Sequence, residues 1–294
     1  MGDVVSAVVS VSSATECHGG AVHGVYYRDE LEALGIGDRE RREMLAAGEL
    51  GSPRKDWFAV PAHHTTVHEA VRGGGVLSCL SALKYYGFWV PPGYPEVHVR
   101  RARGAAKYES SCRGFSRIAA GRTAVDPVAV ALECAARCMR EEDWIAVCDS
   151  VQNSLEVSAE MLRAEMGDLP QRVQEWFGRT DARSQSGTES VVRVRLRSLG
   201  YKVTAQPRID GVGHTDLRIG RLLIECDGRQ YHSSAAEFQA DRTRDRKAVV
   251  DGWIVIRLTY DDVLFGWAEV LEDIRAIATK DRHRSRRPAQ NTGR

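Results

Sequence analysis

The chain has 294 residues, enough for two or three small domains that each bury a core. A hydrophobic content of 43% and a charged content of 28% are typical of a globular protein. The net charge of +1 excludes a strong overall field toward polyanions, although basic clusters recur locally. No apolar run reaches membrane-spanning length and no basic signal-peptide region begins the chain, so we expect a cytoplasmic protein without membrane contact.

The seven cysteines are odd in number, irregular in spacing and without a CxxC pair. This pattern favours a reducing compartment and argues against both a disulfide framework and a structural zinc site. Cys134 and Cys138 lie four residues apart in a helical pattern, and we expect both to be small core residues.

The N-terminal half predicts a small α+β domain followed by helices. Residues 1–24 are rich in glycine and serine, and we expect a flexible segment. Within residues 25–105, one helix ends at Gly35, a second runs from Asp38 to Gly48, and two short strands flank the turn residues 51–53. This order is the outline of a winged helix-turn-helix. Residues 106–180 have a helical pattern.

Basic side chains gather on the second helix and at the tip of the predicted hairpin. As candidates for DNA contact we take Arg39, Arg41, Arg42, Arg54 and Lys55. The alternative is a small helical domain with an ordinary charged surface, because Asp38, Glu40 and Glu43 dilute the basic face.

The polar segment "GRTDARSQSG", residues 178–187, is typical of a domain boundary. Residues 181–280 then predict the order αβββαβ, and residues 281–294 form a basic tail. The middle two strands meet at Gly220-Arg221, which suits a type II′ hairpin turn.

That turn predicts a register between the two strands. Counting outward, Leu217 faces Ile224, Asp216 faces Glu225, and His214 faces Asp227. One face of the hairpin would then be apolar core, and the other would carry three acids and a histidine.

Directly opposed carboxylates are destabilising without a counter-charge. We therefore expect a hard divalent cation, Mg²⁺ or else Mn²⁺, at Asp216, Glu225 and Asp227. The alternative is an exposed sheet face on which Arg218 or Arg221 neutralises the acids.

Four stretches together resemble the PD-(D/E)XK nuclease superfamily, and most of all its DUF559 branch, which is similar to very-short-patch repair endonucleases. They are "SGTESVVRVRLRSLGY", "HTDLRIGRLLIECDGRQYH", "DRTRDRKAVVDGW" and "VIRLTYDDV". The resemblance implies a restriction-endonuclease-like core in which Asp216 and Glu225 bind the metal, with Asp227 a further acid beside it. It also implies His232 as general base or phosphate contact.

Further residues match the superfamily less directly. Glu189 matches an acid on the first helix, although Ser186 and Glu189 also form a capping-box pattern. The basic positions that match, and that would contact phosphates, are Arg242, Arg244 and Arg257. The chain departs from the superfamily where Asp227 replaces the usual lysine, which leaves His214 as a second candidate base.

The N-terminal half resembles the winged-helix antitoxin domain of AbiEi-type type IV toxin–antitoxin systems, through "YYRDELEALGIGDRERREMLAAGEL", "WFAVP" and "GGVLSCLSALKYYGFWVPP". Together the two resemblances imply a Mg²⁺-dependent DNA endonuclease guided by a DNA-binding half, in phage defence or toxin control. The alternatives are a non-catalytic DNA-binding antitoxin or regulator, and a protein that neutralises a toxin or defence component.

Overall fold

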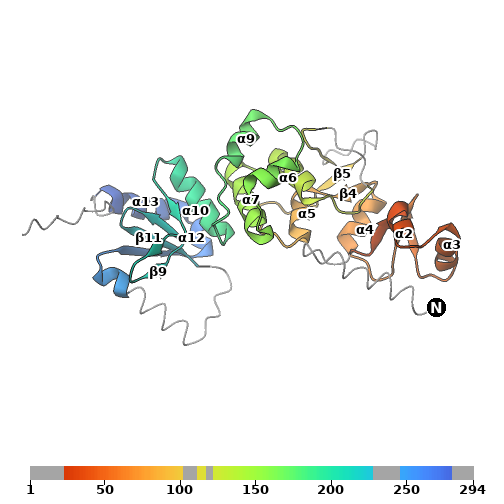
Figure 1. Cartoon of the computed structure of the whole chain (residues 1–294), viewed down its shortest axis with the longest axis horizontal. Helices are drawn as coiled ribbons and strands as arrows, with labels where there is room; N and C mark the ends of the chain where they lie inside the picture. The colour runs from red at the N-terminus through yellow and green to blue at the C-terminus, as the bar shows by residue number, and fades with distance from the viewer. Residues whose placement is uncertain (1–22, 102–110, 117–121, 228–245, 280–294) are drawn as a thin grey trace, which may run out of the picture. The chain divides into compact units, whose positions relative to one another are not determined.

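The computed structural model describes residues 23–101, 111–116, 122–227 and 246–279 (Figure 1). The chain separates into two compact units, residues 1–178 and 179–294, and the second begins within the polar segment 178–187. Both units combine helices with small sheets. Within the described ranges, no helix has the length and apolarity needed to cross a bilayer.

Unit 1 begins with a three-stranded sheet and two short helices. The elements are β1 (Val25–Tyr27), α2 (Arg28–Ala33), α3 (Asp38–Ala46), β2 (Gly51–Arg54) and β3 (Trp57–Ala59), with the strand order β1-β3-β2. Leu31, Ile36, Met44 and Leu50 form their common core. The predicted turn at residues 51–53 is wrong, because those residues belong to β2. The chain reverses at Lys55-Asp56, where Asp56 adopts a left-handed φ of 63°.

The rest of unit 1 holds a second sheet among helices. Its elements are α4 (Thr65–Arg72), β4 (Gly75–Leu77), α5 (Cys79–Tyr85), β5 (Val99–Arg101), β6 (Ser111–Cys112), α6 (Val128–Cys138), α7 (Glu141–Leu155), α8 (Ala159–Ala164) and α9 (Gln171–Phe177). The strands follow the order β4-β5-β6, with β5 and β6 parallel. β6 therefore lies inside residues 106–180, for which the sequence predicts only helices.

Unit 2 is built on one mixed sheet. Its elements are α10 (Gly187–Ser198), β7 (Thr204–Ala205), β8 (Arg208–Ile209), β9 (Gly213–His214), β10 (Leu217–Ile219), β11 (Leu222–Cys226), β12 (Ile254–Leu258), α12 (Tyr260–Leu264) and α13 (Trp267–Thr279). The sheet has the order β12-β11-β10-β7, and β8 pairs with β9 in a separate hairpin. Residues 246–250 are helical and lead into β12.

The hairpin register around Gly220 is confirmed where both strands are paired. Leu217 faces Ile224 and Ile219 faces Leu222, and Gly220 has the positive φ of 58° that the predicted turn requires. The predicted pairing of His214 with Asp227 is wrong. His214 lies in β9, where it faces Arg208, because the chain leaves the main sheet before Leu217.

Strand β11 is buried along its whole length. It lies between β10 and the parallel strand β12, as expected for an interior strand covered on both faces. Leu223 shares the face of Glu225 and packs with Ile209, Val212 and Ala248. The expected clean division into an apolar and an acidic face is therefore wrong, as is the alternative of an exposed sheet face, since Glu225 is only 8% exposed.

Candidate functional site

Glu189 lies in the first turn of α10, and the backbone around it holds its carboxylate in place. The Ser186 hydroxyl accepts a hydrogen bond from the Glu189 N–H (3.2 Å), as the capping pattern predicts. The Glu189 carboxylate accepts from the N–H of Gln185 (3.0 Å), one residue before the predicted partner. The side chain is nearly fully buried, so the helix N-terminus presents a carboxylate to the interior.

Asp216 directly precedes β10, and both of its carboxylate oxygens accept hydrogen bonds. One carboxylate oxygen accepts from the backbone N–H of Cys226 (2.7 Å), which ties Asp216 to the end of β11. The other oxygen accepts from the side-chain amide of Gln206 (3.2 Å). The same Gln206 amide donates to Glu189 (2.9 Å), so one amide group joins the two acids.

Gln206 is the central residue that sequence reasoning misses. It has a left-handed φ of 47°, which is unfavourable for a residue with a Cβ and is found where surrounding structure imposes it. Its backbone N–H donates to the carbonyl of Asp216 (2.8 Å), which holds the strained conformation. A single glutamine outside any motif offers no signal in the sequence.

Neighbouring acids raise the pKa values of groups in this region. Burial raises the pKa of Glu189, and the charge of Asp216 raises it further. Burial also raises the pKa of the Cys226 thiol, and the charges of four acids add to that effect: Asp216, Glu189, Glu225 and Asp227. The four predicted acids therefore lie close enough to act on one residue, and a cation among them would be stabilised.

Arg257 is a cation that the described part of unit 2 places at this site. It faces Glu225 in the parallel register of β11 and β12. Its guanidinium donates to the Asp227 carboxylate (3.2 Å), and both side chains are 30% exposed. The Asp227 backbone N–H donates to Leu258 (2.8 Å), so Asp227 remains attached to β12 just beyond the end of β11.

Among the predicted residues that the structure describes, His214 is separate from this arrangement. His214 is exposed on β9. His232, Arg242 and Arg244 lie outside the described residues.

Carboxylate oxygens are ligands that suit a hard divalent cation such as Mg²⁺. Within the described parts of the chain, however, the acids are not the most compact set of ligand atoms. The set whose ligand atoms all lie within 4.8 Å of one another is Cys79, His98, Cys112 and Cys138. Binding of one ion by three of the acids would require their side chains to move closer together.

The thiol–imidazole cluster also escapes sequence reasoning. Three of its members lie in three different elements and His98 directly precedes a fourth, so no short spacing reveals them. Cys138 is half-buried in this cluster and is not the plain core residue that the helical pattern predicts, whereas Cys134 is fully buried. Hydrogen bonding with Cys112 and Cys79 lowers the pKa of the Cys138 thiol. Irregular cysteine spacing therefore does not exclude a thiolate metal site.

Among the basic residues proposed to contact DNA, the prediction for Arg41 is wrong. It is 3% exposed, donates to the carbonyl of Ile36 (2.8 Å) and forms ion pairs with Glu32 and Asp38. Its guanidinium therefore stabilises the turn between α2 and α3 and is not available to a phosphate.

The other four basic side chains are exposed: Arg39, Arg42, Arg54 and Lys55. Arg54 and Lys55 line a pocket of about 350 Å³ together with Arg122, Tyr27 and Trp57. The tip of the β2–β3 hairpin thus contributes two cations to a hollow that also contains aromatic rings, a combination that suits an anionic, planar ligand.

Comparison of this chain with protein-family models, with curated proteins and with solved structures found no match.

Proposed function

We propose that unit 2 contains the active site of a Mg²⁺-dependent DNA endonuclease, and that unit 1 binds the DNA through the exposed cations of a winged-helix-like region. The observation that carries the proposal is the connection of the buried Glu189 to the partly exposed Asp216 through Gln206, with Glu225, Asp227 and Arg257 beside them. Buried acids that repel one another are costly, and a protein that retains them needs a cation there.

The residues would divide the work as follows. Asp216 and Glu225 hold the cation, with Glu189 or Asp227 as the third carboxylate. A divalent ion bound there would supply an activated water and neutralise charge on the scissile phosphate. Gln206 positions Glu189 and Asp216 before the ion binds. Arg257 offsets charge that develops on the phosphate, and His232 remains our proposed proton acceptor.

The test is a plasmid-nicking assay with Mg²⁺ or Mn²⁺, with and without EDTA. We expect cleavage that EDTA abolishes and that Asp216→Asn reduces by at least about a hundredfold, because the variant removes one ligand charge. Asp210→Asn is the matched control, since Asp210 is exposed in the β8–β9 turn of the same unit. Unchanged cleavage by Asp216→Asn would reject the assignment.

One observation favours a second function, that of a non-catalytic DNA-binding regulator or antitoxin. Asp227 occupies the position where the superfamily has lysine, and Arg257 neutralises it. Such a protein would bind DNA with an affinity that falls steeply as the salt concentration rises, and it would not cleave DNA with either Mg²⁺ or Mn²⁺. The same purified protein and the same assay distinguish the two functions. A stable complex with a toxin and little DNA affinity would favour the protein-neutralising alternative.

A further inference from the structure

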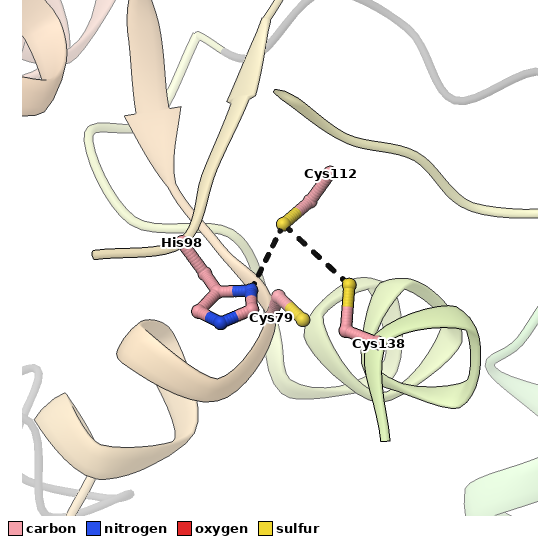
Figure 2. Close-up of side chains that lie close together, drawn as sticks. All are labelled: Cys79, His98, Cys112 and Cys138. Atoms are coloured by element: carbon pink, nitrogen blue, oxygen red, sulfur yellow. Dashed lines mark hydrogen bonds between the residues drawn. The ribbon is translucent and has the colours of Figure 1, made fainter. Parts of the chain in front are cut away.

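We propose that Cys79, His98, Cys112 and Cys138 bind one zinc ion in a closed structural site in unit 1. The site is separate from the carboxylates of unit 2 and does not depend on the proposed nuclease activity. The four side chains point toward a common centre in Figure 2.

The distances match a mononuclear tetrahedral site. His98 Nδ1 lies 3.2 Å from Cys112 Sγ, and the sulfurs of Cys112 and Cys138 are 3.9 Å apart (Figure 2). Zinc–sulfur bonds of about 2.3 Å at tetrahedral angles place ligand sulfurs about 3.8 Å apart. All four ligand atoms lie within 4.8 Å of one another, so small side-chain adjustments suffice to bind the ion.

The four ligands converge from ends of secondary-structure elements. Cys79 begins α5, His98 directly precedes β5, Cys112 ends β6 and Cys138 ends α6. Cys79 has a left-handed φ of 53°, a conformation that has an energetic cost for a non-glycine residue. A bond from its sulfur to a metal would compensate that cost.

Neighbouring hydrogen bonds hold the histidine in position. The backbone N–H of His98 donates to the Ser81 hydroxyl (2.8 Å), and the carbonyl of His98 accepts from the N–H of Ser78 (3.1 Å). These bonds attach His98 to the first turn of α5, beside Cys79. A ligand set attached in this way is organised before the metal binds.

The ligand chemistry selects zinc among the common metals. Three thiolates and one imidazole suit a soft or borderline ion, and Mg²⁺ and Ca²⁺ prefer oxygen. Four protein ligands fill a tetrahedron and leave no position for substrate, which is the pattern of a structural site. Cys79 is fully buried and Cys112 is 6% exposed, so the site is largely closed to solvent.

A disulfide explains the cluster less well. A bond between Cys112 and Cys138 would use two of the four side chains and leave Cys79 and His98 without a reason for their convergence. A zinc ion would instead connect α5, β6 and α6 with the residue that directly precedes β5.

The experiment measures metal in the full-length protein, purified under reducing conditions. We expect about one zinc per chain by mass spectrometry of the metal, and cobalt exchanged into the site should give the visible absorption bands of tetrahedral thiolate coordination. Cys112→Ser should lose the metal. Cys148→Ala is the control, because Cys148 is buried in α7 outside the cluster. This variant should retain the metal.

His98→Cys keeps the proposal testable if Cys112→Ser does not fold. It supplies a fourth thiolate, so it should still bind one zinc and should shift the cobalt absorption bands. Asp216→Asn should retain zinc, which separates this site from the carboxylate site. The proposal is overturned if folded full-length protein takes up neither zinc nor cobalt, if Cys112→Ser binds as much as the unmodified chain, or if peptide mapping of protein purified without reductant shows a Cys112–Cys138 disulfide.

Discussion

Glu189, in helix α10, and Asp216, directly before strand β10, share the side-chain amide of Gln206. The amide offers two N–H donors and no charge, so it keeps the two carboxylates apart without neutralising them. The two acids are thereby held beside one another, where we propose that a cation binds. This relationship leads to a prediction that does not require cleavage to be observed.

Gln206→Glu should destabilise unit 2 in the absence of divalent metal. The variant replaces the shared donor with a third carboxylate, and we expect a loss of about 1–3 kcal/mol. Mg²⁺ should restore much of the lost stability. The stability that Mg²⁺ adds to the variant should exceed the stability that it adds to the unmodified chain. Thermal melts with Mg²⁺ and with EDTA measure the difference, and Gln171→Glu, on the exposed face of α9, is the charge-matched control. Equal responses to Mg²⁺ in the three proteins would contradict the prediction.

Arg257→Gln should weaken the action on DNA. It removes the cation that faces Glu225 and pairs with Asp227, which leaves the acids to repel the phosphate backbone. We expect cleavage to slow by about tenfold or more, equivalent to about 1.4 kcal/mol. Cleavage rates and DNA affinity in Ca²⁺ provide the measurement. Lys202→Gln removes the same charge near the C-terminal end of α10, remote from Glu189, and should behave as the unmodified chain.

Arg41→Gln should lower the stability of unit 1 because it leaves the buried carbonyl of Ile36 without its donor. The loss of this bond, together with the ion pairs to the exposed carboxylates of Glu32 and Asp38, should cost about 1–3 kcal/mol. Arg39→Gln should change stability by less than about 0.5 kcal/mol, since Arg39 is 90% exposed. Urea unfolding of the two variants compares them directly. If Arg39→Gln proved the more damaging, the structural role assigned to Arg41 would be wrong.

Glu30 should make the stability of unit 1 depend on pH. Burial raises its pKa from 4.5 to about 7, even though its carboxylate accepts from the N–H of Tyr27 (2.7 Å). Between these values the folded state retains a proton that the unfolded state has released. Stability therefore falls as pH rises from 4.5 to about 7, and levels above that range.

Glu30→Gln keeps an acceptor for Tyr27 and removes the titration. Its melting temperature relative to the unmodified chain should therefore rise as pH increases from about 5 to about 8. Burial lowers the pKa of His23 to about 4, but His23 is present in both proteins, so its effect cancels in the comparison. A constant difference across this range would show that Glu30 does not titrate as described.

Local sequence signals predicted the parts of the fold that depend on neighbouring residues. Gly220 in the turn, and the alternation of side chains between the two faces of the hairpin, were enough to predict the pairing of Leu217 with Ile224 and of Ile219 with Leu222. The Ser186 cap of α10 was likewise readable from residue types and spacing. Extrapolation of the register failed at His214, because no local signal marks the point where the chain leaves the sheet.

By itself, the sequence determined that Asp216 and Glu225 flank a hairpin and that Ser186 and Glu189 begin a helix, because turns, alternation and caps act over a few residues. Only the tertiary structure decided that Gln206 joins Glu189 to Asp216, that Arg41 is buried, and that Cys79, His98, Cys112 and Cys138 meet. The physical reason is that these contacts join elements distant in the chain. Their formation depends on how helices and strands pack, which spacing along the sequence does not encode.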